Sequence, residues 1–406
     1  MRPTAAPPSE PAALAPALPA SPVRFDDGFC PESGVESFDL RFTLPRLLVG
    51  ELRRRAEAGV GADAHAVLLR DAVRTPEAPG VLERARQAAI ATPDDASAQV
   101  TLAVVARAQG RHDEQLAALR RARALLPNVP AVGFALAEAT RDGAELDEAL
   151  DGLSTYLAAD PSPGPSRLRA RLELQRDMQR DYHRLTRGGV TVLWPPELLS
   201  EAQAADVAST VHRDLDAAAA FTGSPRRARL TVVIYPSRSE LLAVSCVPAW
   251  SGGLSDGTLR VVAAGDGVVN AVALRHEPLH ARLTSLGART PRWFDEGVAQ
   301  AFAGEPEPRP RWELMRKNRT SIPFSSLDGS FSSIHAAGDA GLACAQSYAM
   351  VELMRERGGD GVIATALAAF RAGADGSTAL ARACRQRQVT HADLLAFLDA
   401  RLSRAR

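Results

Sequence analysis

The stretch Arg275-His276-Glu277-Pro278-Leu279-His280 is followed by Pro291-Arg292-Trp293-Phe294-Asp295-Glu296-Gly297-Val298-Ala299. In a helix, residues four apart lie on one face with their Cβ atoms about 5–6 Å apart, so His276 and His280 would lie side by side. Glu296 comes sixteen residues after His280, a distance that suits a second helix. The pattern therefore predicts two imidazoles and one carboxylate on neighbouring helices.

Two histidines at this spacing, with a third ligand from the next helix, are typical of a zinc site. Because His276, His280 and Glu296 supply three ligands, a tetrahedral ion keeps one position open, as catalytic zinc ions do. Zinc lowers the pKa of water that it binds to roughly 7. Glu277 follows the first ligand and is the candidate general base for that water. The sequence thus predicts a hydrolytic Zn2+ site.

Chance and ordinary packing are the alternatives to a metal site. With 8 His and 48 acidic residues among 406, a His-acid-x-x-His match arises by chance in about 2% of such chains. His276 and His280 could also be ordinary polar positions of a buried helix. Proline inside a helix removes a backbone hydrogen bond and costs about 3 kcal/mol or more. We therefore expect either a kink at Pro278 or a slightly distorted site.

The segments His276–His280 and Trp293–Ala299 resemble the gluzincin metallopeptidases, and most of all the peptidase MA-like domains that bacteria fuse to tetratricopeptide repeats. The resemblance covers roughly residues 189–402 and implies a zincin-like domain with a small mixed sheet and a helical lower lobe. It implies a zinc-dependent peptidase in which Tyr348 donates to the oxyanion, although Tyr348 could instead be a core residue. It also implies that the strand Leu259–Val262 is the sheet edge that pairs with an extended peptide substrate.

Some residues around the motifs have two interpretations. Asp295 is either an acceptor for a ligand imidazole or a solvated carboxylate, and Trp293 is expected to pack under the ligand helix. Pro278 is not usual in this family, and Cys344 stands where relatives often carry an aromatic residue. The alternative function is therefore a catalytically inactive relative that acts as a repeat-based protein-binding adaptor.

A 34-residue period runs through residues 46–165. Three prolines and three leucines keep this spacing: Pro93, Pro127, Pro161, Leu82, Leu116 and Leu150. Such a period of paired helices is the tetratricopeptide signature, in which stacked pairs complete a core that one pair cannot form. We expect two good repeats and a degenerate one that starts near Gly61. The repeats would either bind a partner protein or peptide, or act as a spacer against the second domain.

The remaining segments complete the predicted domain order. Residues 1–45, rich in Pro, Ala and Ser, predict a disordered arm, and residues 166–188 a connector helix that ends at Gly188-Gly189. From residue 189 to 402, strands alternate with helices before a helical end. The predicted fold class is helix-rich α+β, with an N-terminal α-solenoid followed by a zincin-like domain that contains a small mixed sheet.

Composition limits the partners that we expect. The formal net charge is zero, which gives no indication of a nucleic-acid partner. No run approaches the roughly 18 apolar residues of a membrane helix, and prolines interrupt the N-terminal region, so neither a signal peptide nor an integral membrane segment is expected. The four cysteines form no Cys-x-x-Cys pair and are expected to be free thiols. A cytoplasmic protein with a protein or peptide substrate is the default expectation.

Overall fold

The computed structural model describes the chain from residue 80 onward, apart from short gaps. The described residues are 80–109, 111–142, 145–159, 161, 163–223, 229–245, 253–255, 258–264, 267–285, 290–328, 331, 334, 337–359, 361–371, 374–384 and 390–403. They form a helix-rich protein with one mixed five-stranded sheet, which confirms the predicted α+β class. The arm expected over residues 1–45 and the repeat expected near Gly61 lie outside the described residues.

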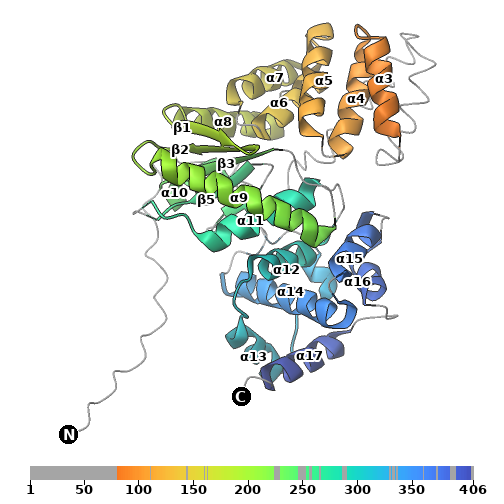
Figure 1. The fold of residues 1–406 in the computed structure, drawn as a ribbon, viewed down its shortest axis with the longest axis vertical. Coiled ribbons are helices and arrows are strands. Elements are labelled where there is room, and N and C mark those ends of the chain that lie inside the picture. Colours follow the sequence, from red (N-terminus) through yellow and green to blue (C-terminus); the bar gives the residue numbers. More distant parts are fainter. Residues whose placement is uncertain are drawn as a thin grey trace.

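Six helices precede the sheet in the described part of the chain, and each packs against the next (Figure 1). They are α3 (Val81–Ala91), α4 (Ala96–Ala108), α5 (His112–Leu125), α6 (Pro130–Asp142), α7 (Leu146–Ala159) and α8 (Pro163–Met178). The starts of α4 and α6 are 34 residues apart, as are those of α5 and α7. The period of the sequence is therefore also the period of these helices.

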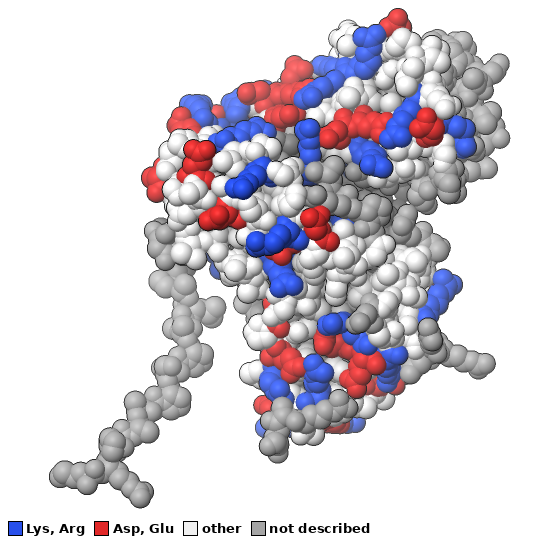
Figure 2. Space-filling view, viewed as in Figure 1, with Lys and Arg blue, Asp and Glu red and all other residues white. Residues whose placement is uncertain are grey.

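Ion pairs between alternate helices follow the same period. Arg86 on α3 pairs with Glu114 on α5, and Arg120 on α5 pairs with Glu148 on α7, each at 2.5 Å. Acidic and basic side chains accordingly interleave across this part of the surface (Figure 2). Apolar side chains from all six helices form one core beneath them. The helix stack is thus stabilised mainly by shared apolar burial, since exposed ion pairs contribute little.

The sheet has the strand order β1-β2-β3-β5-β4. Its strands are β1 (His183–Arg187), β2 (Val190–Trp194), β3 (Leu230–Tyr235), β4 (Gly253–Ser255) and β5 (Thr258–Val262). Strands β2, β3 and β5 are parallel, whereas β1 and β4 run antiparallel at the two edges. In the central register, Leu193 lies opposite Val233, which lies opposite Arg260.

The hairpin of β1 and β2 corrects the connector helix predicted over residues 166–188. Helix α8 ends at Met178, and His183–Arg187 pairs with β2. Gly188 and Gly189 have φ values of 59° and 82°, the positive values that a two-residue hairpin turn requires. The two glycines therefore join two strands and do not end a helix.

Strand β4 corrects two further expectations. The sequence predicts a loop over Trp250–Gly257, but Gly253–Ser255 forms a strand that pairs antiparallel with β5. The edge on this side of the sheet is therefore β4, and the strand Leu259–Val262 lies inside the sheet between β3 and β4. A three-residue strand that contains glycine has too weak a propensity to be found by pattern alone.

Helices cover both faces of the sheet. On one face lie α9 (Glu201–Thr222) and α11 (Ala271–Ser285), and on the other lie α10 (Arg238–Val244) and the end of α8. Serine hydroxyls cap two of these helices. The Ser200 hydroxyl accepts a hydrogen bond from the Gln203 N–H at the start of α9, and Ser237 does the same for the Glu240 N–H in α10.

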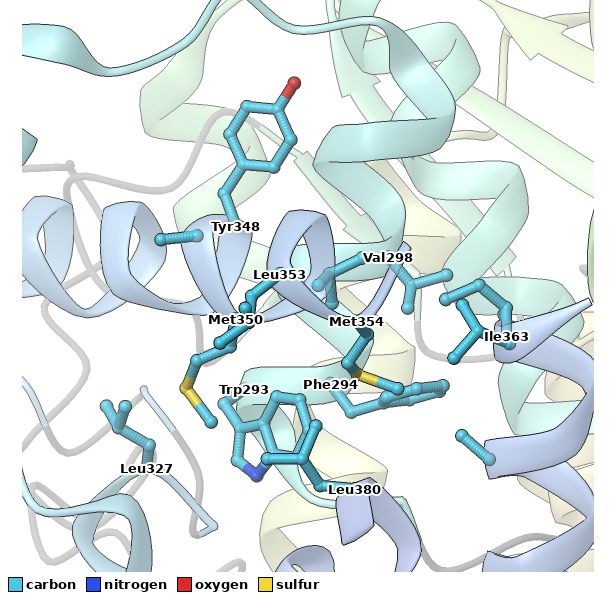
Figure 3. Packing of buried hydrophobic residues seen from close by; sticks show 14 of the residues in the cluster. Trp293, Phe294, Val298, Leu327, Tyr348, Met350, Leu353, Met354, Ile363 and Leu380 are labelled. Atoms are coloured by element: carbon cyan, nitrogen blue, oxygen red, sulfur yellow. The ribbon is translucent and has the colours of Figure 1, made fainter. Parts of the chain in front are cut away.

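Six helices follow α11 and form a lower lobe in the described part of the chain. They are α12 (Arg292–Ala303), α13 (Arg309–Asn318), α14 (Ala337–Gly358), α15 (Val362–Arg371), α16 (Gly376–Ala383) and α17 (His391–Ser403). Trp293 and Phe294 lie in their common core (Figure 3). These helices form the helical end that the sequence predicts for the stretch up to residue 402.

The described helices and cysteines bear on two expectations from composition. In that part of the chain, no helix combines the length and apolar character needed to cross a membrane. Cys344 and Cys384 are free thiols, as expected. Burial raises the pKa of Cys344 to about 12, so this thiol is protonated and unreactive at neutral pH.

Candidate metal centre

Helix α11 carries the first two predicted ligands. The Asn270 side chain caps its first turn by accepting hydrogen bonds from two backbone N–H groups, at 2.9 and 3.4 Å. The helix continues through Pro278 as one element, so the proline removes a backbone hydrogen bond without ending the helix. His276 and His280 remain on one face, and their Nε2 atoms are 3.0 Å apart.

Helix α12 carries the third predicted ligand. It packs against α11 on one side and α14 on the other. Gly297 permits this approach, because a Cβ atom there would collide with the carbonyl oxygen of Ser347 on α14. The neighbouring Glu296 is buried, and its carboxylate faces both imidazoles. The Glu-Gly pair of the motif thus has a packing reason as well as a chemical one.

The three side chains converge with the separations that a shared ion requires. Glu296 Oε2 is 3.6 Å from His276 Nε2, and Glu296 Oε1 is 3.6 Å from His280 Nε2. In a tetrahedral zinc site with bonds of about 2.0–2.1 Å, neighbouring donor atoms are about 3.3 Å apart. The observed separations of 3.0, 3.6 and 3.6 Å lie on both sides of this value. The three groups could therefore hold a metal ion between them.

The same contacts can also form without a cation. Burial would lower the pKa of His276, but hydrogen bonds to Glu296 and Glu305 raise it to about 10. Burial lowers the pKa of His280 to about 3. A protonated His276 could then donate from Nε2 to the unprotonated Nε2 of His280. A hydrogen-bonded imidazole pair is therefore the cation-free alternative for this geometry.

Arg292 also belongs to the candidate site, although no role for it is predicted above. Its Nη2 atom lies 2.5 Å from Glu296 Oε1. Burial would lower the pKa of Arg292, but Glu296 and Asp295 raise it. Burial alone would raise the pKa of Glu296. The positive charge of Arg292 and the two histidines instead hold this pKa far below its usual range. An arginine four residues before the third ligand was the available signal, because such pairs meet on a helix.

Glu305 is the second member that the sequence analysis missed. Its Oε1 atom lies 2.7 Å from Nδ1 of His276. A carboxylate in this position fixes the ring and leaves the other nitrogen, Nε2, free to bind a metal. Asp295, considered for this role, is therefore not the acceptor for His276 Nδ1. Glu305 directly follows Gly304, the left-handed residue that ends α12, and this chain reversal brings it back to α11.

Glu277 lies on the side of α11 that faces the sheet edge. A Cβ atom on Gly253 of β4 would be 2.9 Å from Glu277 Oε1, so the carboxylate lies directly against the strand backbone. Burial raises the pKa of Glu277 to about 7. A carboxylate with this pKa can both accept and return a proton near neutral pH. The predicted general base is therefore buried beside the edge strand.

Tyr348 has a different neighbourhood from the predicted ligands. Its hydroxyl donates a hydrogen bond to the backbone carbonyl of Glu305 at 3.1 Å. It projects from the side of α14 opposite to Met350 and Trp293 (Figure 3). Burial raises its pKa, and the charges of Glu352 and Glu307 raise it further. The hydroxyl thus contacts the segment that holds His276, and this contact defines a supporting position.

Trp293 occupies the packing position that the sequence predicts. Its ring is almost fully buried, and its Nε1 atom donates a hydrogen bond to Asp328 Oδ1 at 3.2 Å. Trp250 and Gly252, which precede β4 in the sequence, lie outside the described residues. Gly253, from the same stretch, is the strand residue that contacts Glu277.

Comparisons with known proteins add no family assignment. The sequence matches no protein-family model, and no curated protein matches it at a significant level. The resemblance to gluzincins therefore rests on the residues of α11 and α12 alone.

Proposed function

We propose that this protein is a zinc-dependent peptidase in which His276, His280 and Glu296 hold the ion. The observation that supports this most is the convergence of three donor atoms, from two helices, at separations of 3.0–3.6 Å. Two imidazoles and one carboxylate leave a tetrahedral ion one further position. That combination is typical of hydrolytic rather than structural zinc sites.

Glu277 is the proposed general base. A zinc ion at this site would supply Lewis acidity, which activates water and polarises the scissile carbonyl. Glu277 takes the proton of the attacking water and passes it to the leaving amine, a role that suits a pKa of about 7. Its burial between α11 and β4 also excludes competing solvent from the carboxylate.

The edge strand β4 supports a peptide as the substrate. It pairs with β5, and among the described residues it is the last strand on this side of the sheet. An extended peptide could add to this edge through main-chain hydrogen bonds, which would bring a peptide bond close to Glu277. Such binding recognises backbone more than side chains, so we expect broad sequence tolerance.

The repeated helices form the second part of the proposal. Their 34-residue period supports a tetratricopeptide solenoid that binds a partner protein or the substrate. The alternative is a spacer, because α8 packs through Leu174 and Met178 against the sheet beside Leu193 and Val233.

A second candidate function is a catalytically inactive, repeat-based adaptor. Two observations favour it: Pro278 lies within the ligand helix, and Arg292 already neutralises Glu296 at 2.5 Å. In this alternative the imidazole pair and Arg292 simply satisfy a buried carboxylate, and no ion is needed.

Metal content measured beside activity on a mixed peptide library separates the two functions. We expect the purified full-length chain to hold about one zinc ion and to cleave peptides. Glu277→Gln should retain the zinc and lower turnover by at least about 100-fold. His276→Ala combined with His280→Ala should lose both metal and activity. A wild-type chain that binds no zinc and cleaves nothing would favour the adaptor, and unchanged cleavage by Glu277→Gln would exclude the proposed base.

A further inference from the structure

The contacts that hold Glu305 continue from the metal centre to the C-terminal helix α17. The Glu305 side chain faces His276, and its carbonyl oxygen accepts a hydrogen bond from Tyr348. Two residues later, Glu307 Oε1 accepts a hydrogen bond from Arg401 Nε on α17 at 2.7 Å. The segment Glu305–Glu307 is therefore held at one end by His276, a proposed metal ligand. At the other end it is held by Arg401, in the last turn of α17.

The pair of Glu307 and Arg401 belongs to a small charged network. Arg401 Nη2 also lies 3.5 Å from Glu352 Oε2 on α14, and Glu352 Oε1 lies 2.7 Å from Arg355. Acidic and basic side chains gather on this lobe in the surface view (Figure 2). The Glu352 side chain is only 12% exposed and that of Glu307 22%. These pairs are therefore less screened by salt than fully exposed ones.

The segment between α12 and α13 is too short to absorb a displacement. Only Glu305–Pro308 separate the glycine that ends α12 from the start of α13. The Glu305 N–H donates to the carbonyl of Gln300, and the Arg309 N–H donates to that of Glu307 at 2.7 Å. Consecutive Cα atoms are about 3.8 Å apart, so a shift of Glu307 moves the Glu305 carboxylate relative to His276.

We propose that Arg401 is a positioning residue for the metal centre. By fixing Glu307 it holds the Glu305 segment in place, and Glu305 in turn orients the His276 ring toward the ion. The affinity for zinc then depends on how α17 packs against the lobe. Arg401 on this helix is 94 residues from Glu307 in the sequence. This inference rests on the proposed zinc site but not on catalysis, because zinc binding can be measured by itself.

Helix α17 has independent anchors, so changing Arg401 need not release it. Four apolar side chains of the helix lie in the lobe core: Leu394, Phe397, Leu398 and Leu402. At its other end, Arg357 Nη2 lies 2.9 Å from Asp393 Oδ1. This second pair also joins α14 to α17, but it does not involve the Glu305 segment.

The test compares zinc affinity in two full-length variants that each remove one arginine from the ion pairs of α17. Arg401→Met removes the charge and keeps the aliphatic stem; Arg357→Met is the matched control. The two pairs are alike. Arg401 and Glu307 are 2.7 Å apart, with side chains 35% and 22% exposed. Arg357 and Asp393 are 2.9 Å apart, with side chains 24% and 29% exposed. Competition with a chromogenic chelator measures the Kd for zinc, and thermal melting of the metal-free proteins measures stability.

We expect Arg401→Met to weaken zinc binding by roughly 3- to 30-fold, the range of coupling through packed networks, while Arg357→Met leaves the Kd unchanged. Glu307→Gln should behave like Arg401→Met. When Glu305→Gln is already present, Arg401→Met should weaken zinc binding little further, because both substitutions act through the contact between Glu305 and His276. Arg401→Lys, which keeps one charged donor, should recover part of the affinity.

Equal zinc affinity in wild type and Arg401→Met would overturn this inference and leave the proposed zinc site intact. Equal weakening by Arg401→Met and Arg357→Met would also overturn it, because docking of α17 in general would then be the cause. A wild-type chain that binds no zinc would instead overturn the proposed site itself, so the two failures are distinguishable.

Discussion

Arg292 and Glu296 lie one turn apart on α12, and their charged groups meet at 2.5 Å although the same carboxylate also faces two imidazoles. Arg292 thus supplies a permanent positive charge to a carboxylate that is only 11% exposed. A zinc ion at the site would supply charge to the same group. The stability of the folded protein should therefore depend on Arg292 most when zinc is absent.

We predict that Arg292→Met lowers the free energy of unfolding of the metal-free protein by about 1–3 kcal/mol, because it removes the permanent positive charge that pairs with a buried carboxylate. The zinc-loaded protein should lose less, so zinc should raise the Tm of the variant more than that of wild type. Calorimetry with and without zinc measures this. Arg355→Met is the control, since Arg355 pairs with Glu352 at similar exposure away from the site. Equal losses by Arg292→Met in both forms would contradict the prediction.

One substitution of Tyr348 distinguishes a structural role for its hydroxyl from a role as the oxyanion donor. Because its hydroxyl donates to the Glu305 carbonyl, we expect Tyr348→Phe to lower stability by about 0.5–1.5 kcal/mol and to change kcat by less than about threefold. An oxyanion donor would instead lower kcat by roughly 100- to 1,000-fold with zinc retained. Urea unfolding and steady-state kinetics on one preparation distinguish these results.

The positions of the candidate ligands and of most helices were predictable because their signals are local. The spacing of His276 and His280 fixes one helical face, and the capping residues Ser200 and Ser237 mark helix starts by chemistry with residues three positions away. The 34-residue period likewise records a packing unit that recurs along the chain. The histidine spacing and the caps can be read within one or two turns of helix, and the period can be read from the sequence by itself.

The rest of the site depends on contacts between distant residues. Glu305 contacts a histidine 29 residues earlier, and no local pattern marks that pairing. Strand β4 exists because β5 pairs with it, and the charged β1 reads as a helix end until β2 supplies its partner. The direction of the Tyr348 hydroxyl follows from how α14 packs. In each case tertiary context outweighs local propensity.

We predict that Gly253 is essential to the placement of Glu277, the proposed general base. A Cβ atom there would lie 2.9 Å from Glu277 Oε1 and 3.3 Å from the Arg260 carbonyl oxygen, so the carboxylate must move. We expect Gly253→Ala to retain zinc but to lower kcat by at least about tenfold, because the displaced base no longer faces the water. Gly338→Ala, at an open position of α14, should leave kcat and zinc content unchanged. Full activity in Gly253→Ala would show that the Glu277 carboxylate is not confined by β4.

Asp393 in the first turn of α17 should make stability depend on pH. Hydrogen bonds from the side chain and backbone of Thr390, and from Arg357, lower its pKa to about 2. Because this is below the unfolded value of about 3.9, the ionised carboxylate stabilises the folded state above about pH 4. That contribution is lost as the pH falls toward 2.

We therefore predict that Asp393→Asn lowers the free energy of unfolding by about 1 kcal/mol at pH 7, a modest value because the carboxylate is partly exposed and screened. The difference from wild type should shrink by about half at pH 3, where the unfolded aspartate already holds its proton. Urea unfolding at pH 7, 5 and 3 measures both values. Asp399→Asn, which removes a more exposed partner of Arg319 on the same helix, should cost less at pH 7. A difference for Asp393→Asn that stays constant from pH 7 to pH 3 would mean that its charge does not stabilise α17.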